Sequence, residues 1–344
     1  MNEMMSENQV VGQTTLLRLG FLGVGWIGRH RMKAILDTGL ARAVAISDPS
    51  PEMAEEARKL APDAAMVDGL EELLRHDLDG IVIATPSALH AQQSVEALSA
   101  GVAVFCQKPL GRSGGEVAAV IEAAKTTDRL LDVDLSYRQT TGLGQIRELV
   151  RAGALGHVFA ADLTFHNAYG PDKPWFYDRA LSGGGCVMDL GVHLIDMALW
   201  CLDFPAVRHI TSQLMAGGKP LDALADSVED YAVATITLET GIVVRITCSW
   251  RLQAGQDAVI DARFFGTEGG ASMHNVGGSF YDFMTERFRG TSREILAEPP
   301  EDWGGRAAAA WASRLAQSGA YDPACESILK VTETLDGIYK AAST

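Results

Sequence analysis

The sequence predicts two domains: an N-terminal α/β domain built on a parallel sheet, and an α+β domain whose sheet is mostly antiparallel. Between residues 15 and 135, short apolar runs alternate with amphipathic segments, which is typical of a parallel sheet with helices on both faces. A glycine-rich turn directly follows the first apolar run. Beyond residue 135 strands become dominant, and the run 242–251 has a period of two with one polar face, which indicates an antiparallel sheet covered on one side.

In the first domain each apolar run reads as a strand and each amphipathic segment as a helix. The expected strands are 16–22, 42–47, 80–84, 102–106 and 130–134. The expected helices are 26–37, 51–60, 69–75, 88–99 and 113–126.

In the second domain, a helix at 142–152 leads to a long strand at 157–166 and an irregular aromatic loop at 167–184. A very apolar helix follows at 186–201. The expected strands after it are 206–216, 228–238, 242–251 and 258–266. Within 242–251, Val244, Ile246, Cys248 and Trp250 share one face and polar residues the other. We expect a loose tail at 1–14, domains at 15–137 and 138–322, and a C-terminal helix in 323–344 that packs back on the first domain.

Composition narrows the choice of partners. The formal net charge of −15 argues against a nucleic acid or an anionic membrane. The five cysteines are widely spaced and form no C-x-x-C pair, which fits reduced thiols in the cytoplasm. The N-terminus lacks the basic start and apolar core of a signal peptide, and we expect no apolar stretch to be long enough to cross a bilayer.

The glycine-rich turn reads Gly23-Val24-Gly25-Trp26-Ile27-Gly28, and Asp48 ends the next apolar run. Strand, glycine turn, helix, second strand and acid together are typical of a Rossmann dinucleotide site. Gly23 would allow the tight turn, Gly25 the approach of a pyrophosphate, and Gly28 close packing of the helix. Asp48 would accept hydrogen bonds from the adenosine ribose. The alternative is an ordinary strand–turn–helix with a coincidental acid.

The apolar helix 186–201 carries a narrow polar stripe. Asp189, His193 and Asp196 fall within an arc of roughly 60° at about 100° per residue. Burying such groups without partners is costly, so we expect the stripe to face a cleft. A carboxylate four residues from an imidazole can orient the ring as a general base. A satisfied structural cluster is the alternative. Two metal ligands are also conceivable, but no third ligand is evident, so no metal is expected.

Two further segments follow strands of the first domain, where ligands of open parallel sheets bind. Lys108 follows the strand 102–106 and could stabilise an alkoxide, although a solvated surface charge is the commoner role for such a lysine. Thr85-Pro86 and His90 follow the strand 80–84 and could line a dinucleotide or simply cap a helix. His166 ends the strand 157–166 near the expected cleft. The aromatic residues Tyr169, Trp175, Phe176 and Tyr177 could wall a pocket or pack in a core or interface.

Together these residues resemble the glucose–fructose oxidoreductase / inositol dehydrogenase / MocA family, from about residue 16 to residue 341. The matching motifs are the glycine turn at 23–28, Thr85-Pro86 with His90, Lys108-Pro109-Leu110, and Ser182-Gly-Gly-Gly leading to Asp189-x-Gly191-x-His193-x-x-Asp196.

The resemblance implies a Rossmann domain joined to an open-faced sheet that forms homodimers or homotetramers. It also implies NAD(P)-dependent oxidation of a sugar, a polyol or a related hydroxy compound. Carried onto this sequence, it makes Lys108 and His193 the catalytic pair, with Asp189 holding the substrate or the imidazole. Arg138, His166 and Asp196 match positions that often touch substrate.

Two positions depart from the family. Gln107 stands before the lysine, where Glu is usual, and a neutral amide supplies no counter-charge. The loop 253–257 lacks the tyrosine that polyol-oxidising members often carry, which puts an inositol-like substrate in doubt.

The sequence therefore predicts a cytoplasmic dehydrogenase in which His193 removes the hydroxyl proton and Lys108 steadies the alkoxide. We expect NAD and not NADP, because Asp48 would repel a 2′-phosphate and residues 47–51 offer no Arg or Lys to receive one. The alternatives are an NADPH-dependent reductase of a keto-sugar or imine, a non-catalytic dinucleotide sensor, and an enzyme that retains NAD while cycling two substrates.

Overall fold

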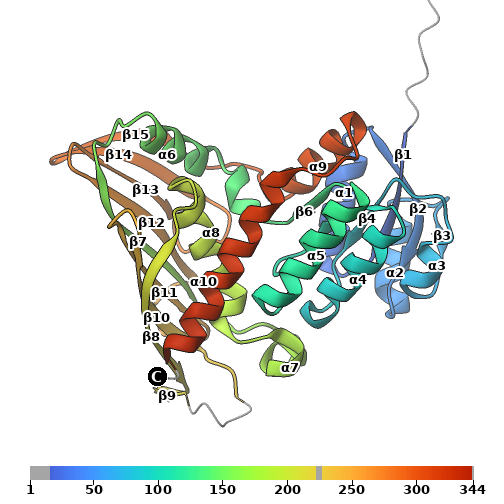
Figure 1. The fold of residues 1–344 in the computed structure, drawn as a ribbon, viewed down its shortest axis with the longest axis horizontal. Coiled ribbons are helices and arrows are strands. Elements are labelled where there is room, and N and C mark those ends of the chain that lie inside the picture. The colour runs from blue at the N-terminus through green and yellow to red at the C-terminus, as the bar shows by residue number, and fades with distance from the viewer. Residues whose placement is uncertain (1–15, 222–226, 343–344) are drawn as a thin grey trace, which may run out of the picture.

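The computed structural model describes residues 16–221 and 227–342, so the expected tail at 1–14 lies outside the described residues. Two sheet-based units stand side by side, with the long helix α10 (Ser327–Ala342) between them (Figure 1). The mostly parallel and mostly antiparallel sheets confirm the predicted fold class.

The first unit is a six-stranded parallel sheet in the order β3-β2-β1-β4-β5-β6. This order is that of the Rossmann fold, and its switch point lies between β1 and β4. Its strands are β1 (Leu17–Leu22), β2 (Ala41–Ser47), β3 (Ala65–Met66), β4 (Gly80–Ile83), β5 (Ala103–Cys106) and β6 (Leu131–Val133). Its helices are α1 (Trp26–Leu36), α2 (Pro51–Arg58), α3 (Gly69–Leu73), α4 (Ser87–Ser99) and α5 (Gly114–Thr127). The sequence predicted all of these elements except the two-residue β3.

The second unit is a nine-stranded sheet in the order β15-β14-β13-β12-β7-β11-β10-β8-β9. Only β7 and β11 run parallel among its paired strands in the described part of the chain. Its strands are β7 (Val158–Asn167), β8 (Val207–Ala216), β9 (Lys219–Pro220), β10 (Tyr231–Leu238), β11 (Val243–Ser249), β12 (Ala258–Gly266), β13 (Gly270–Asn275), β14 (Phe283–Arg289) and β15 (Ser292–Ala297).

Helices cover one face of this sheet, on the side of the first unit (Figure 1). They are α6 (Thr141–Arg151), α8 (Val192–Cys201) and α10. Val244, Ile246, Cys248 and Trp250 are buried beneath them, which confirms the predicted alternation along β11. The loop before α8 holds the short helices η2 (Pro174–Tyr177), α7 (Arg179–Ser182) and η3 (Val187–Gly191).

Helix α9 (Arg306–Gln317) packs on the first unit, although it falls within the sequence range expected for the second domain. Trp311 is fully buried against Phe105 of β5, with ring centroids 5.7 Å apart. Gly80 makes room for this ring, because a Cβ there would lie 2.8 Å from it. After α9, the turn η4 (Pro323–Glu326) leads to α10, which contacts α5 of the first unit as well as α8 and β8 of the second.

One segment contradicts our expectation that no apolar stretch could cross a bilayer. Arg179–Cys201 has 23 residues and contains an 18-residue window with a mean hydropathy of 1.3, so its length and composition are those of a membrane span. In the fold 89% of that window is buried, as in a core helix.

Candidate functional site

A cavity of about 1280 Å³ lies where the two units meet, at the carboxyl ends of β1, β4 and β5. Its walls come from the glycine turn, the segments 84–90 and 107–109, the aromatic loop, and the helices η3 and α8. Open parallel sheets bind ligands at this edge, next to the switch point. The cavity therefore holds most of the residues predicted for cofactor and substrate.

The glycine turn has the shape that a pyrophosphate requires. Gly23 has φ +80°, and a Cβ there would lie 2.6 Å from the backbone of Ala84. A Cβ at Gly28 would lie 2.2 Å from the Gly23 carbonyl oxygen, so both positions require glycine. A Cβ at Gly25 would meet no atom within 4 Å, which leaves this side of the turn open to the cavity. No side chain caps the first amides of α1, and these can bind an anion. The turn thus fits a dinucleotide.

Asp48 lines the same cavity but already accepts two backbone hydrogen bonds. Val24 N donates to its Oδ2 at 2.7 Å, and Ser50 N donates to its Oδ1 at 2.9 Å. These bonds hold the carboxylate beside the glycine turn. Arg29 of α1 also lines the cavity and donates from Nη1 to the Val24 carbonyl oxygen at 3.0 Å. In the sequence only residues 47–51 were considered as a source of a cation that could receive a 2′-phosphate, so Arg29 was missed.

Lys108 does not project as a solvated surface charge. Its Nζ donates to Asp189 Oδ1 at 2.7 Å and to the Asp189 carbonyl oxygen at 2.8 Å. Trp250 Nε1 donates to the other carboxylate oxygen, Oδ2, at 3.1 Å. Asp189 therefore fixes the ammonium group at the cavity wall across the junction of the two units. Asp189 was expected to hold the substrate or the imidazole; among the described residues its hydrogen bonds go to Lys108 and Trp250 and not to His193.

His193 lines the cavity, and its ring packs edge-on against Tyr137 at a centroid distance of 5.0 Å. Burial lowers its pKa well below the ordinary value, and the positive charges of Lys108 and Arg31 lower it further. The ring is consequently neutral near pH 7 and can accept a proton.

The predicted polar stripe is divided between two elements: Asp189 lies in the π-helical turn η3, and His193 and Asp196 lie in the regular helix α8. Such π turns often occur at functional sites. Asp189 faces Lys108, whereas Asp196 lies outside the cavity wall and binds Arg138 at 2.5 Å. Asp196 is 1% exposed, so this is a buried ion pair beside Phe204. The structure therefore corrects the expected substrate contacts of both Arg138 and Asp196.

His166 is also displaced from its expected place. Side chains alternate along β7, and those of the neighbours Phe165 and Asn167 line the cavity while that of His166 does not. Its Nδ1 lies 2.8 Å from Ser249 Oγ, and its ring stacks on Tyr231 at 6.2 Å. Because successive side chains of a strand point to opposite faces, the imidazole of His166 lies on the face of the sheet away from the cavity.

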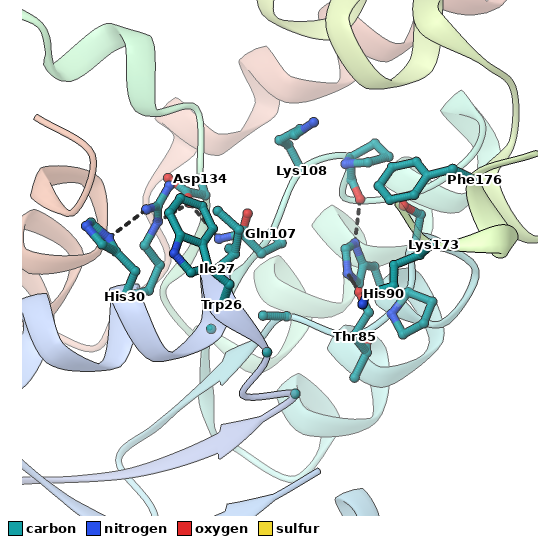
Figure 2. Close-up of a pocket in the computed structure, with 18 of the residues that line it drawn as sticks. Trp26, Ile27, His30, Thr85, His90, Gln107, Lys108, Asp134, Lys173 and Phe176 are labelled. Carbon is teal, nitrogen blue, oxygen red and sulfur yellow. Dashed lines mark hydrogen bonds and ion pairs between the residues drawn. The ribbon is translucent and has the colours of Figure 1, made fainter. Parts of the chain in front are cut away.

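The segment 84–90 lines the cavity, but His90 has a supporting position within it. The His90 ring is 1% exposed and lies between two carbonyl oxygens, those of Thr85 and Pro109, at 2.7 Å each (Figure 2). It thereby ties the turn after β4 to the turn that carries Lys108. Thr85 Oγ1 donates to Gln93 Oε1 at 2.6 Å, and neither Thr85 nor Ser87 caps α4.

Of the aromatic loop residues, Trp175 and Phe176 line the cavity, whereas Tyr169 and Tyr177 do not. Trp175 and Phe176 stack at a centroid distance of 3.8 Å. Trp303 and Tyr281 complete an aromatic wall that the sequence had not indicated.

Two family matches cover most of the chain. Residues 17–135 match the family described as "Oxidoreductase family, NAD-binding Rossmann fold", and residues 143–272 match the "GFO/IDH/MocA C-terminal domain". The chain belongs to the Gfo/Idh/MocA family of oxidoreductases.

Characterised relatives of this Gfo/Idh/MocA chain include sugar dehydrogenases. It is 27% identical over 284 residues to the levoglucosan dehydrogenase of Pseudarthrobacter phenanthrenivorans, covering 74% of this chain and 72% of that one. It is 26% identical over 250 residues to the D-glucoside 3-dehydrogenase of Escherichia coli, covering 70% and 68%. Its fold matches the NADP complex of KijD10, a 3-ketoreductase from Actinomadura kijaniata, with a TM-score of 0.81, 20% identity and coverage of 95% and 98%.

Gln107 departs from the family's usual glutamate, and the structure shows what surrounds it. Its Nε2 donates to Asp134 Oδ2 at 2.5 Å, and Asp134 pairs with Arg31 at the same distance (Figure 2). Sequence reasoning missed Asp134 and Arg31. Asp134 comes directly after β6. Ligands of open parallel sheets bind beyond the carboxyl ends of the strands, and this rule, which indicated Lys108, could also have indicated Asp134.

Proposed function

We propose that this oxidoreductase is an NAD-dependent dehydrogenase that oxidises a secondary hydroxyl of a sugar or a related polyhydroxy compound. The observation that carries the proposal is the junction of the two units. There Lys108, fixed by Asp189, and the neutral imidazole of His193 line one cavity with an open glycine turn. The two sugar dehydrogenases among its relatives support the substrate class.

In the proposed reaction His193 accepts the hydroxyl proton, and the Lys108 ammonium stabilises the negative charge that develops on the oxygen. Bound NAD⁺ supplies the acceptor for the hydride that leaves the carbinol carbon. Asp189 holds Lys108 in place through both of its contacts. The products are a ketone, NADH and a protonated His193, which returns its proton to water.

The cavity combines polar and charged side chains with several aromatic rings. Trp175 and Phe176 present flat apolar surface, while Asn167 and Lys173 offer hydrogen bonds. Such a pocket suits a pyranose ring, which has apolar C–H faces and polar edges. We therefore propose a glycoside or anhydrosugar in preference to inositol.

His193 supplies the direct test of this function. Replacing His193 with Ala should lower kcat by about 10²-fold or more, because the proton acceptor is lost. The affinity for NADH should change little, since the glycine turn is untouched. Stopped-flow rates and NADH fluorescence titrations measure the two quantities. A fully active His193→Ala variant would remove the proposed base.

Asp48 and Arg29 bear on the choice of cofactor. We propose that Asp48 selects NAD by accepting hydrogen bonds from the adenosine ribose, while Arg29 lines the same cavity and could receive a 2′-phosphate. Titration of nucleotide-stripped protein with NADH and with NADPH separates the two. Preference for NADPH would favour the reductive alternative, and binding without turnover of any sugar would favour a sensor. Nucleotide retained by the purified protein would indicate a tightly bound cofactor.

We further propose a cytoplasmic homodimer or homotetramer that associates through the open face of the nine-stranded sheet. The five cysteines are all free and buried, in keeping with a reducing compartment. Phe159 and Ile295 are exposed on strands of that sheet, as an association surface requires. Sedimentation of the purified protein tests the assembly.

A further inference from the structure

A chain of polar contacts, buried except at the half-buried His30, runs beside the cavity from α1 to the turn after β5. Arg31 Nη1 donates to His30 Nδ1 at 2.9 Å, and Arg31 Nε donates to Asp134 Oδ2 at 2.5 Å. Gln107 Nε2 donates to the same carboxylate oxygen at 2.5 Å. All four residues line the cavity, and Figure 2 shows His30, Asp134 and Gln107 in line beside it.

This chain is more deeply buried than the other ion pairs of the cavity. Asp134 is 1% exposed, Arg31 is 6% exposed and Gln107 is 9% exposed. A buried ion pair that loses one partner leaves an uncompensated charge, which is strongly unfavourable. Arg31 and Asp134 therefore constrain each other, and both constrain the side chain at position 107.

The second carboxylate oxygen of Asp134 shows why the side chain at position 107 should donate a hydrogen bond and carry no negative charge. Asp134 Oδ1 accepts no hydrogen bond from the described residues, so the carboxylate still lacks donors. The amide of Gln107 supplies one donor without adding charge. A glutamate in its place would set two carboxylates within hydrogen-bond distance, and one of them would have to take up a proton or move away.

The contacts also connect the two sides of the proposed active site. Arg31 belongs to α1, whose N-terminus follows the glycine turn, and Gln107 immediately precedes Lys108. Fixing the side chain at 107 consequently fixes the turn from which Lys108 reaches Asp189.

We propose that Gln107 and Asp134 form a charge-matched pair that positions Lys108 against the cofactor turn, and that Asp134 requires an amide at position 107. Both are positioning residues, which act through Lys108. The proposal rests on the proposed function for its effect on rate, but the matching of charge is a property of the protein alone.

Exchanging the two side chains tests the pair. The variants are Gln107→Glu, Asp134→Asn and the double exchange, which keeps one amide, one carboxylate and the net charge. Each single variant should lower kcat/KM by about 10- to 100-fold, mostly through kcat, because Lys108 is displaced. The double variant should retain more activity than the product of the two single losses predicts, but it should not recover fully, because Arg31 then lacks the Asp134 carboxylate. If the loss of kcat/KM in the double variant equals the product of the two single losses, the two side chains act independently and the proposal is overturned.

The pH dependence of Gln107→Glu distinguishes this role from a general structural defect. The charged or titratable groups around position 107 are Arg31, His30, Asp134, Lys108 and His193. At low pH the introduced carboxyl group is protonated and can donate to Asp134 as the amide does, so the variant's activity relative to the parent should rise as pH falls. A pH-independent ratio would contradict the proposal.

Gln92→Glu is the matched control. Gln92 Nε2 also donates to a carboxylate, Glu96 Oε1 at 2.8 Å, but on the exposed face of α4. Water screens the new charge there, so rate and pH profile should stay within about twofold of the parent.

A readout without turnover separates failure of the pair from failure of the proposed function. NADH affinity and melting temperature should fall in both single variants and recover in part in the double variant, whether or not a sugar is oxidised. If Asp134→Asn does not fold, the comparison of Gln107→Glu with the parent and with the double variant still tests the proposal. An unimpaired Gln107→Glu, or a double variant weaker than Gln107→Glu, would overturn the proposal.

Discussion

At the scale of single residues, the surroundings of His193 decide its protonation state. Burial is the largest influence, and the cationic Lys108 and Arg31 act in the same direction, so all three lower its pKa below 6.5. Asp189 does not offset them at the ring, because its oxygens are bonded to Lys108 and Trp250. The result is a base that stays unprotonated in mildly acidic solution.

This state predicts the pH dependence of oxidation. Because the folded pKa of His193 lies below 6.5, kcat/KM should hold its plateau as pH falls through 6.5 and decline only well below it. Folding stability should already weaken as pH falls below 6.5, while activity is still on its plateau, because the unfolded state takes up the proton first. Replacing Lys108 with Met should raise the His193 pKa, which histidine NMR can follow. An acid limb at or above pH 6.5 in the parent would contradict this account.

At the scale of elements, the π-helical turn η3 holds Asp189 against Lys108 at the cavity. Glu229 holds its start, because its Oε1 accepts hydrogen bonds from Gly185 N and Val187 N at 2.9 Å each. Tyr339 of α10 donates to the same oxygen at 2.8 Å. The helical turn that carries Asp189 is thus anchored by the carboxylate of Glu229, just before β10, which is itself bound by Tyr339 of the C-terminal helix.

Gly185 is the position where this anchor tolerates no side chain. A Cβ there would lie 1.9 Å from the Glu229 carbonyl oxygen, so Gly185→Ala should destabilise the fold by about 1–3 kcal/mol and lower kcat by shifting Asp189. Gly144→Ala in α6 is the control. Its Cβ would meet nothing within 4 Å, so it should be neutral or stabilise by up to about 1 kcal/mol. Thermal melting compares the two, and equal effects would argue against the anchor.

The elements also show what the sequence could and could not predict. The sequence placed the glycine turn, Asp48 and Lys108 at the cavity because their positions follow from the local order of strand, turn and helix. The sequence predicted that Asp189, His193 and Asp196 would share one face towards the cleft. Asp196 instead pairs with Arg138 away from the cavity, a contact between distant segments that the helical period does not reveal. β14 and β15 were missed because charged residues such as Glu286 and Arg293 interrupt their apolar alternation. The alanine-rich α9 was missed although its high helix propensity was a usable signal.

At the scale of the whole molecule, the chain returns to its first domain near its end. Helix α9 buries Ala308, Trp311 and Ala312 against the first sheet and α1, and α10 then lies between the two units. No local pattern in residues 306–317 says which domain they complete, because that depends on packing between segments far apart in the sequence. The pairing of Gln107 with Asp134 was unpredictable for the same reason.

This arrangement predicts that the two units unfold together. Trp311 is fully buried, and Trp311→Ala should cost about 3–5 kcal/mol by leaving a cavity against Phe105. Because residues from both ends of the chain form the first unit, calorimetry should show one transition that moves as a whole to lower temperature. NADH should raise that transition in the parent and in the variant, since the glycine turn is intact. A Trp311→Ala variant with two separate transitions, one of them at the parent's temperature, would show instead that the second unit is stable without α9 in place.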